Sequence, residues 1–458
     1  MPRNLKFCLL ILLCFCFSYL LVFWNNDDSF YHASPLPIVY SNQCQIQDWN
    51  RVETHSISTS LWGSMSRKLW MALDLSRENS QNYTKLSLIG AYVYPTYISI
   101  TVNSQSMVKQ SVYCRYFDCK RNELFGSEWQ GTVFPESVVH CPRRKGAEFV
   151  SVTKAMEDEP PMPMRLKYRI FEKPVHNFTI CVAAFYGNEP KWIQIAEFIE
   201  HHKMEGATFF YFHIGNISSY DKKILDEYEN QGDIEIKVLQ ENYERPFYAW
   251  QLIEIQDCHM RSKYHSKWTA FIDIDERIHT LQKNKTFVDI LNDLDSTNAA
   301  EIRMPHLKVI KNGETPKFFE NPEQIKNELF SRKYTRTAEP TWDASKAVIR
   351  PDRVGIMSIH ETIALEPGYN TVHLHSDQMV FRHYRDVLHR VSGNDWAQNE
   401  TISERPIPSE YTDLLAKKVV ERVEFVYKKV PVNCTTIPEY MTSSRDFPTA
   451  CEKMLLTW

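Results

Sequence analysis

The sequence WTAFIDIDER (268–277) decides the fold, because an apolar run ends there in three acidic residues. Trp268 to Ile274 are mostly apolar, aromatic or β-branched, which predicts a buried strand. Residues two apart in a strand point to the same side, so Asp273 and Asp275 can face one ligand together. The stretch therefore predicts a strand that ends in a pair of carboxylates.

Upstream of this stretch, strand-like and helix-like segments alternate. The predicted strands are 178–185 (FTICVAAF), 208–214 and 234–239, and the predicted helices are 192–206, 218–232 and 247–261. A near-continuous apolar run such as 178–185 is typical of a strand buried on both faces. Alternation at βαβ spacing predicts an α/β fold with a mainly parallel sheet and helices on both faces. No Gly-rich dinucleotide fingerprint follows the first strand, which argues against a redox cofactor.

The N-terminal segment predicts a membrane anchor. Phe7 to Trp24 are 18 residues without a charge, just long enough to cross a bilayer core of ~30 Å at ~1.5 Å per helical residue. Basic residues precede this run and acidic residues follow it, which predicts a cytosolic N-terminus and a luminal remainder. A cleaved signal peptide is the alternative, and His32-Ala33-Ser34 leaves it open. We expect a single-pass type II protein of the Golgi or ER membrane.

Cysteines and sequons agree with a luminal location. Three cysteines lie in the apolar segment as palmitoylation candidates, and eight follow it: Cys44, Cys114, Cys119, Cys141, Cys181, Cys258, Cys434 and Cys451. An even number in an oxidising compartment predicts disulfides of open connectivity, and a zinc site at Cys114 and Cys119 is the weaker interpretation. Cys181 and Cys258 could be thiols or a disulfide. Sequons occur at Asn82, Asn177, Asn216, Asn284, Asn399 and Asn433.

Composition changes along the chain predict several parts. They are a tail (1–6), the anchor (7–24), a stem (25–60), a small all-β domain (61–155), a linker (156–175), the α/β domain (176–395) and a C-terminal extension (396–458). The formal net charge of −4 with mixed signs argues against a nucleic-acid partner. The oligomeric state stays open.

The acidic pair predicts a metal site for a nucleotide sugar. Ligands of parallel α/β sheets bind at the carboxyl ends of strands, where Asp273 and Asp275 are expected. Two carboxylates side by side are costly unless a cation neutralises them, and a hard divalent ion could also hold a diphosphate. Transfer from a nucleotide sugar needs that charge, because the diphosphate gains negative charge as it leaves. A solvated strand end is the alternative, which the preceding βα units and the secretory context make the weaker one.

A consistent series of motifs runs from Cys181 to about Arg385. They are CVAAFYGNE (181–189), Trp192, Glu197, His201, His202, QLIEIQDCHMR (251–261), Lys267 to Glu276, KAVIRPDR (346–353), His360 and HYR (383–385). In these motifs the chain resembles glycosyltransferase family 92, a family with a GT-A-like fold, and its nematode branch more than the plant one. The resemblance implies galactosyl transfer from UDP-galactose with inversion, Mn²⁺ dependence, and glycan or glycoprotein acceptors such as the core fucose of N-glycans. It further implies nucleotide-sugar contacts at Ala184, Glu189, Gln251, Arg261 and Asp273.

GT-A enzymes often take a third metal ligand from a late histidine. His383, at the end of a predicted strand, resembles that histidine in animal β-1,4-galactosyltransferases and is expected to join Asp273 and Asp275, with His360 as the alternative. An inverting transfer also needs a carboxylate base. Glu361 is the first candidate, and Asp343 beside Trp342 is the second.

Two other functions stay open at this point. One is a catalytically inactive luminal glycan-binding or scaffold protein, which loss of Asp273 or Asp275 would favour. The other is a different nucleotide-sugar or phospho-ester enzyme on the same sheet, because the fold alone does not fix the chemistry.

Overall fold

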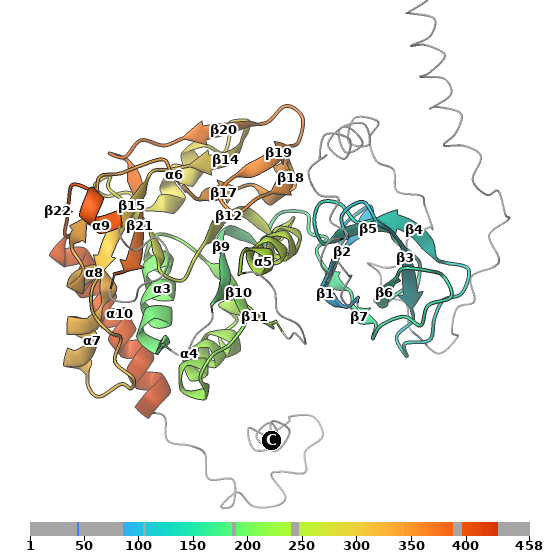
Figure 1. Ribbon diagram of the computed structural model, residues 1–458, viewed down its shortest axis with the longest axis horizontal. Coiled ribbons are helices and arrows are strands. Elements are labelled where there is room, and N and C mark those ends of the chain that lie inside the picture. The colour runs from blue at the N-terminus through green and yellow to red at the C-terminus, as the bar shows by residue number, and fades with distance from the viewer. Residues whose placement is uncertain are drawn as a thin grey trace, which may run out of the picture.

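A computed structural model describes residue 44 and residues 86–103, 107–185, 189–239, 247–343, 345–387 and 396–428. It has a small all-β part and a larger α/β part (Figure 1). The predicted anchor lies outside the described residues, and so does the predicted stem except for Cys44. Cys434 and Cys451 also lie outside them. Within the described ranges, no helix is both long and apolar enough to span a membrane.

Two four-stranded sheets form the all-β part. Their orders are β5 (Val138–Pro142), β2 (Tyr97–Val102), β1 (Leu88–Val93), β8 (Lys167–Tyr168), and β4 (Trp129–Thr132), β3 (Ser111–Phe117), β6 (Phe149–Thr153), β7 (Met164–Arg165). Disulfides join Cys114 to Cys141, from β3 to β5, and Cys44 to Cys119. These pairings replace the zinc interpretation. The short strands β7 and β8 place part of the predicted linker in this part.

The main sheet has seven strands and is mainly parallel. Its order is β11 (Ile234–Val238), β10 (Phe209–Ile214), β9 (His176–Phe185), β12 (Ser266–Ile272), β17 (Ala347–Ile349), β14 (Ala299–Arg303) and β20 (Asn370–His373). Neighbours pair in parallel, except that β17 is antiparallel to both β12 and β14. Because β17 runs in the opposite direction, its amino end lies at the edge where its neighbours have their carboxyl ends.

Helices cover both faces of this sheet. Phe178, Ile180 and Val182 of β9 pack in one core with α3 (Trp192–Met204), α4 (Ser219–Asn230) and α6 (Phe287–Asp293). Cys181 points to the opposite face, as strand alternation requires, and packs there with α5 (Phe247–Ser262). It forms a disulfide with Cys258 of α5, which settles the question left open by the sequence.

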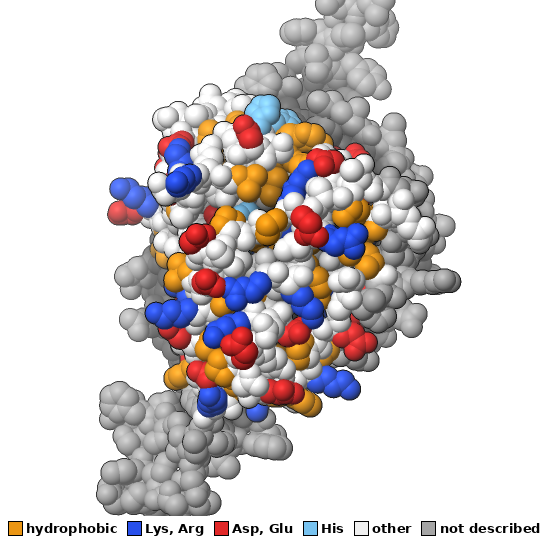
Figure 2. Space-filling model, turned by 90° about the vertical axis from the view of Figure 1, so that its left-hand side faces the viewer, with side chains coloured by type: hydrophobic (Ala, Val, Ile, Leu, Met, Phe, Trp, Pro, Cys, Tyr) orange, Lys and Arg blue, Asp and Glu red, His pale blue; other side chains and the backbone are white. Residues whose placement is uncertain are grey.

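A second sheet continues the α/β part. Its order is β13 (Glu276–Thr280), β21 (Met379–Asp386), β15 (His306–Lys311), β16 (Arg336–Thr337) and β22 (Ser403–Glu404). The further elements of this part are α7 (Pro322–Glu328), α8 (Phe330–Lys333), η2 (Pro351–Arg353), α9 (Trp396–Asn399) and the hairpin of β18 (Val354–Met357) with β19 (Thr362–Leu365). Helix α10 (Ser409–Lys428) buries Leu415, Val419 and Val423 in the main core. The predicted boundary at residue 395 therefore divides residues that share one core. Basic and acidic side chains intermingle on the face that includes α7, α8 and α10 (Figure 2).

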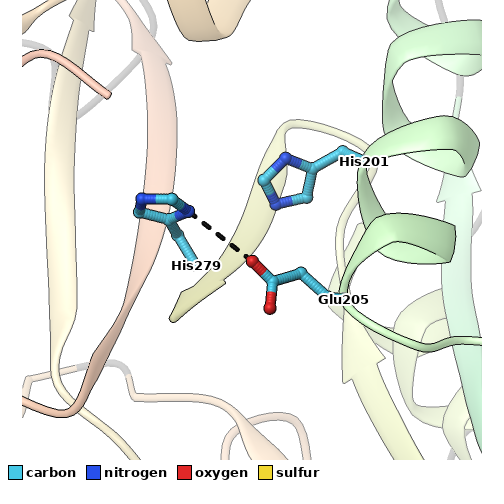
Figure 3. Close-up of side chains that lie close together, drawn as sticks. All are labelled: His201, Glu205 and His279. Carbon is cyan, nitrogen blue, oxygen red and sulfur yellow. Dashed lines mark ion pairs between the residues drawn. The ribbon is translucent and has the colours of Figure 1, made fainter. Parts of the chain in front are cut away.

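Three buried polar residues lie close together: His201 of α3, Glu205 directly after α3 and His279 of β13 (Figure 3). Tyr411 of α10 contacts His201. Their residue types suit a metal site, but His201 and Glu205 already have hydrogen-bond partners, and His279 Nδ1 lies 3.6 Å from Glu205 Oε1. His201 Nε2 lies 2.6 Å from the Ile278 carbonyl oxygen, and Tyr411 Oη lies 3.1 Å from His201 Nδ1. A ring nitrogen that bonds a carbonyl must carry the proton, so Nδ1 accepts from the Tyr411 hydroxyl.

The Glu205 carboxylate is equally engaged. Its Oε2 accepts from the Thr280 hydroxyl at 2.8 Å and from the Phe287 N–H at 3.0 Å, and Oε1 accepts from the Thr280 N–H at 3.4 Å. Burial lowers the pKa of His201 well below its usual range, which keeps the ring neutral. We interpret this cluster as a hydrogen-bond network that fastens α10 to α3 and β13.

A second buried network joins the all-β part to α5. Asp257 of α5 accepts from Tyr92 Oη at 2.9 Å and from His213, and Lys237 donates to Asp257, to Tyr92 and to the Ile89 carbonyl. Burial acts to raise the pKa of Asp257, but Lys237 and His213 outweigh it and hold that pKa far below its usual range. Since α5 also carries Gln251 and Glu254, this network supports the helix that faces the cavity described below.

The network leaves no room for a side chain at Gly90. A Cβ at this position would lie 2.4 Å from Asp257 Oδ1 and 2.5 Å from Lys237 Nζ. We therefore expect Gly90→Ala to lower the free energy of unfolding by about 1–3 kcal/mol, measured by chemical denaturation. Gly355→Ala is the matched control, because its Cβ would meet no atom closer than 3.6 Å. Equal stability of the two variants would contradict the described packing.

Removing the Tyr411 hydroxyl tests the network beneath α10. Tyr411→Phe leaves His201 Nδ1 without its donor, so we expect a loss of about 1–3 kcal/mol of unfolding free energy. Tyr369→Phe, at an exposed position, should change stability little. If the cluster instead held a metal, EDTA would lower the unfolding temperature of the wild type, an effect that we do not expect.

Candidate active site

The acidic residues lie in the turn between β12 and β13. After β12 ends at Ile272, the Asp273 N–H donates to Glu276 Oε2 at 2.8 Å, and the Glu276 N–H donates to the Asp273 carbonyl at 3.0 Å. Strand β13 then pairs with β21 in the antiparallel register that sets Glu276 opposite His383. Residues more than a hundred positions apart thus meet at the carboxyl edge of the main sheet.

This edge opens into a cavity of about 640 Å³. The residues lining it are Ala183, Ala184, Phe185, Glu189, Lys191, Gln194, Gln251, Glu254, Asp273, Ile274, Asp275, Glu276, His306, Lys308, Lys346, His360, His383, Arg385 and Trp396. Its volume lies in the range of small-molecule sites. The lining combines an acidic cluster with several basic side chains, so the cavity suits a ligand with both an anionic group and a bound cation.

Lys346 neutralises one end of the acidic cluster. Its Nζ lies 2.7 Å from Asp273 Oδ2 and 3.5 Å from Glu276 Oε2, and its side chain is only 4% exposed. Burial acts to lower the pKa of Lys346, but Asp273 and Glu276 outweigh it and hold the pKa above its usual range. Gln251 Nε2 also approaches Asp273, at 3.4 Å from Oδ1.

His383 lies at the other end of the cluster. Its Nε2 is 3.2 Å from Asp275 Oδ2, and its Nδ1 is 3.2 Å from Glu276 Oε1 and 3.1 Å from His306 Nε2. Burial acts to lower the pKa of His383, but Asp275 and Glu276 outweigh it, and the pKa is raised. His383 in turn overcomes the effect of burial on Asp275 and lowers its pKa to about 2. Burial raises the pKa of Glu276.

The structure brings together most of the residues predicted to bind the nucleotide sugar. Ala184, Glu189, Gln251 and Asp273 all line the cavity, and the Ala184 N–H donates to Glu254 Oε2 at 2.7 Å. Arg261 does not line it, which corrects the predicted contact at this position. Its buried guanidinium donates to the Glu235 carboxylate and carbonyl groups, at 3.1 and 2.7 Å. Arg261 therefore has a structural role in the network next to the all-β part.

Neither candidate base lines the cavity. Glu361 directly follows His360, which does, and its 55% exposed side chain is held by Arg303 at 2.9 Å. The side chain of Asp343 is exposed. The exposed Trp342 ring packs against His373, with 5.3 Å between centroids. The placement of Asp343 thus gives it no described contact with the cavity.

Several cavity residues were missed by motif reasoning. Lys191 precedes α3, Lys308 and His306 lie in β15, and Arg385 lies in β21. Burial and His383 lower the pKa of His306 to about 3. Lys191 directly precedes α3 and Arg385 lies near the end of β21, so position gave a signal for these two, but Lys308 lies within β15 and had none. Lys346 belonged to the stretch 346–353 that carried the family resemblance, but no motif gave it a role.

Comparisons with known proteins agree with one family. The sequence profile of glycosyltransferase family 92 matches residues 176–420, more than half of the 458 residues. Beta-1,4-galactosyltransferase galt-1 of Caenorhabditis elegans is 27% identical over 274 residues, which are 54% of this chain and 60% of galt-1. A glycosyltransferase family 92 protein of Oryza sativa subsp. japonica is 22% identical over 283 residues, 57% of this chain and 44% of the rice protein. The match thus spans less than two thirds of either relative.

Solved structures show a remote likeness. Residues 1–349 of S. aureus TarS align with 58% of this chain and 77% of that protein, at 10% identity and a TM-score of 0.26. The same TarS fragment in complex with UDP-GlcNAc gives 11% identity and a TM-score of 0.27, over 56% of this chain and 76% of that fragment. The family rests on the sequence profile, and by that measure the chain belongs to glycosyltransferase family 92.

Proposed function

We propose that the protein is a metal-dependent glycosyltransferase of GT-A type that transfers galactose from UDP-galactose, with inversion, to a glycan acceptor. The observation that carries this proposal is the cluster of Asp273, Asp275 and His383 in a cavity also lined by basic side chains. The name of the nematode relative, a beta-1,4-galactosyltransferase, supports galactose as the sugar. The core fucose of an N-glycan is our candidate acceptor, from the nematode resemblance.

The residues present fit a divalent cation. Asp273 and Asp275 offer carboxylate oxygens and His383 offers a ring nitrogen, and Mn²⁺ accepts this mixture more readily than Mg²⁺. His360, the alternative third ligand, also lines the cavity, but no described contact joins it to either aspartate. A bound cation would offset the negative charge that the diphosphate gains on leaving. Lys191, Lys308 and Arg385 add fixed positive charge to the same cavity.

The reaction requires one proton transfer from the acceptor. The acceptor hydroxyl forms a bond to the anomeric carbon, the bond from that carbon to the UDP oxygen breaks, and a carboxylate takes the hydroxyl proton. Glu361 is our candidate base, because it directly follows His360 of the cavity lining and Arg303 fixes the position of its side chain. Asp343 lacks such an anchor.

We also propose a luminal location, in the Golgi or the ER, with a membrane anchor at Phe7–Trp24. Three disulfides within the described residues support an oxidising compartment. The six sequons and the charge pattern around the apolar segment agree with this proposal.

The acidic cluster can be tested by Asp275→Asn. We expect transfer to fall by about 10²-fold or more, since a preorganised electrostatic group is lost, while the luminal protein is still secreted. Asp377→Asn, at an exposed position, is the matched control. The assay should compare UDP-galactose, UDP-glucose, UDP-GlcNAc and GDP-sugars across a Mn²⁺ titration. Full turnover by Asp275→Asn at saturating Mn²⁺ would refute the assignment.

The proposed base can be tested by Glu361→Gln. This change keeps the shape but removes the proton acceptor, so kcat should fall by about 10² to 10⁴-fold with UDP affinity unchanged. Asp343→Asn should alter kcat much less. An unchanged kcat in Glu361→Gln would show that Glu361 is not the base. Glu189 of the cavity lining would then be the next carboxylate to test.

A further inference from the structure

Lys346 places a buried positive charge where a metal-binding site is proposed. Its ammonium group is 2.7 Å from Asp273 Oδ2 and 3.5 Å from Glu276 Oε2. At these distances it already satisfies an oxygen of Asp273, the residue that the proposed function assigns to the metal. Lys346 also lines the cavity, so it lies next to any ligand that enters there.

The position of Lys346 follows from the topology of the sheet. Lys346 directly precedes β17, and β17 runs antiparallel to β12, with Ala270 opposite Val348. The amino end of β17 therefore lies beside the carboxyl end of β12, where the acidic turn begins. Among the described strands of the main sheet, β17 alone runs in the opposite direction, and this direction brings Lys346 to the edge with the acidic turn.

Lys346 compensates the charge of the carboxylates in the absence of ligands, but it would repel a divalent cation bound to Asp273. Without ligands, the buried Glu276 and the partly exposed Asp273 and Asp275 place acidic groups side by side, and the buried Lys346 supplies a compensating charge. A divalent cation at Asp273 would face the ammonium group at close range, and like charges in a buried site repel strongly. A nucleotide diphosphate carries negative charges that can pair with the divalent cation and with the Lys346 ammonium group at the same time.

We propose, on the basis of the proposed function, that Lys346 is a resident counter-cation that opposes metal binding to the free protein and pairs with the diphosphate when metal and nucleotide bind together. Metal and nucleotide then bind cooperatively, because each removes the repulsion that the other would meet. By linkage, UDP raises the Mn²⁺ affinity by the same factor as Mn²⁺ raises the UDP affinity. Lys346 is a positioning residue, and its effect is measurable without turnover.

The test is the Mn²⁺ affinity of the luminal protein, measured by titration calorimetry with and without UDP. In Lys346→Met we expect Mn²⁺ binding without UDP to tighten by about 10-fold or more. In the same variant, the factor by which UDP strengthens Mn²⁺ binding should shrink, and UDP alone should bind more weakly. Lys346→Arg keeps the positive charge and should resemble the wild type.

Lys267→Met is the control for a general change in charge. Lys267 lies at the opposite end of β12 and pairs with Asp295, so its loss should leave the Mn²⁺ affinity unchanged. Lys346→Gln serves as a second neutral variant that can still donate to Asp273. If a neutral variant does not fold alone, the inference requires that Mn²⁺ rescue its folding, because the metal replaces the missing cation.

The outcomes separate this inference from the proposed function. A wild type that binds neither Mn²⁺ nor UDP refutes the proposed function. A wild type that binds both, together with neutral variants whose Mn²⁺ affinity without UDP is unchanged or weaker, refutes the role of Lys346 alone. Failure of Mn²⁺ to rescue a neutral variant that does not fold refutes it as well.

Discussion

The structure depends on how three carboxylates in one tight turn are held at the end of a buried strand. Asp273, Asp275 and Glu276 follow β12 within four positions, and repulsion between their like charges acts against this turn. Two features oppose the repulsion. Strand β21 pairs with β13 and sets His383 against Asp275 and Glu276, and the antiparallel β17 delivers Lys346 to Asp273. The second sheet and the reversed strand are therefore what allow this turn to exist.

The remainder of the molecule holds the walls of the cavity in place. Helix α5 contributes Gln251 and Glu254 to the lining and is fixed to β9 twice, by the Cys181–Cys258 disulfide and by the bond from the Ala184 N–H to Glu254. On its outer side, Asp257 ties α5 to the all-β part through Tyr92 and Lys237. The all-β part thus has a physical role in supporting the site, whether or not it binds a glycan.

The sequence could predict the elements that follow local rules. The buried runs of β9 and β12 and the acidic pair at the end of β12 depend on residues next to each other, and the structure has these strands where the pattern put them. The pairing of His383 with the acidic turn depends on register between strands about a hundred residues apart, and family resemblance rather than periodicity pointed to that histidine. Arg261 was misassigned because a buried arginine in a motif looks the same whether it binds a phosphate or Glu235. Lys346 stayed without a role because the direction of a three-residue strand is not visible in its sequence.

The energetics of the acidic turn also discriminate between the functions that the sequence left open. A protein that only binds glycans or serves as a scaffold gains little from a partly buried cluster of three carboxylates with a buried lysine, because apolar residues of similar volume usually give equal or greater stability. Such arrangements persist where charge has a task in a ligand site. Here the cluster lies in a cavity of about 640 Å³, and its opposing charges, Lys346 and His383, come from two separate parts of the chain. Charged groups that lower the stability of the fold and all face one cavity are better explained by the binding of a charged substrate than by a role in folding. This favours an active transferase over a scaffold.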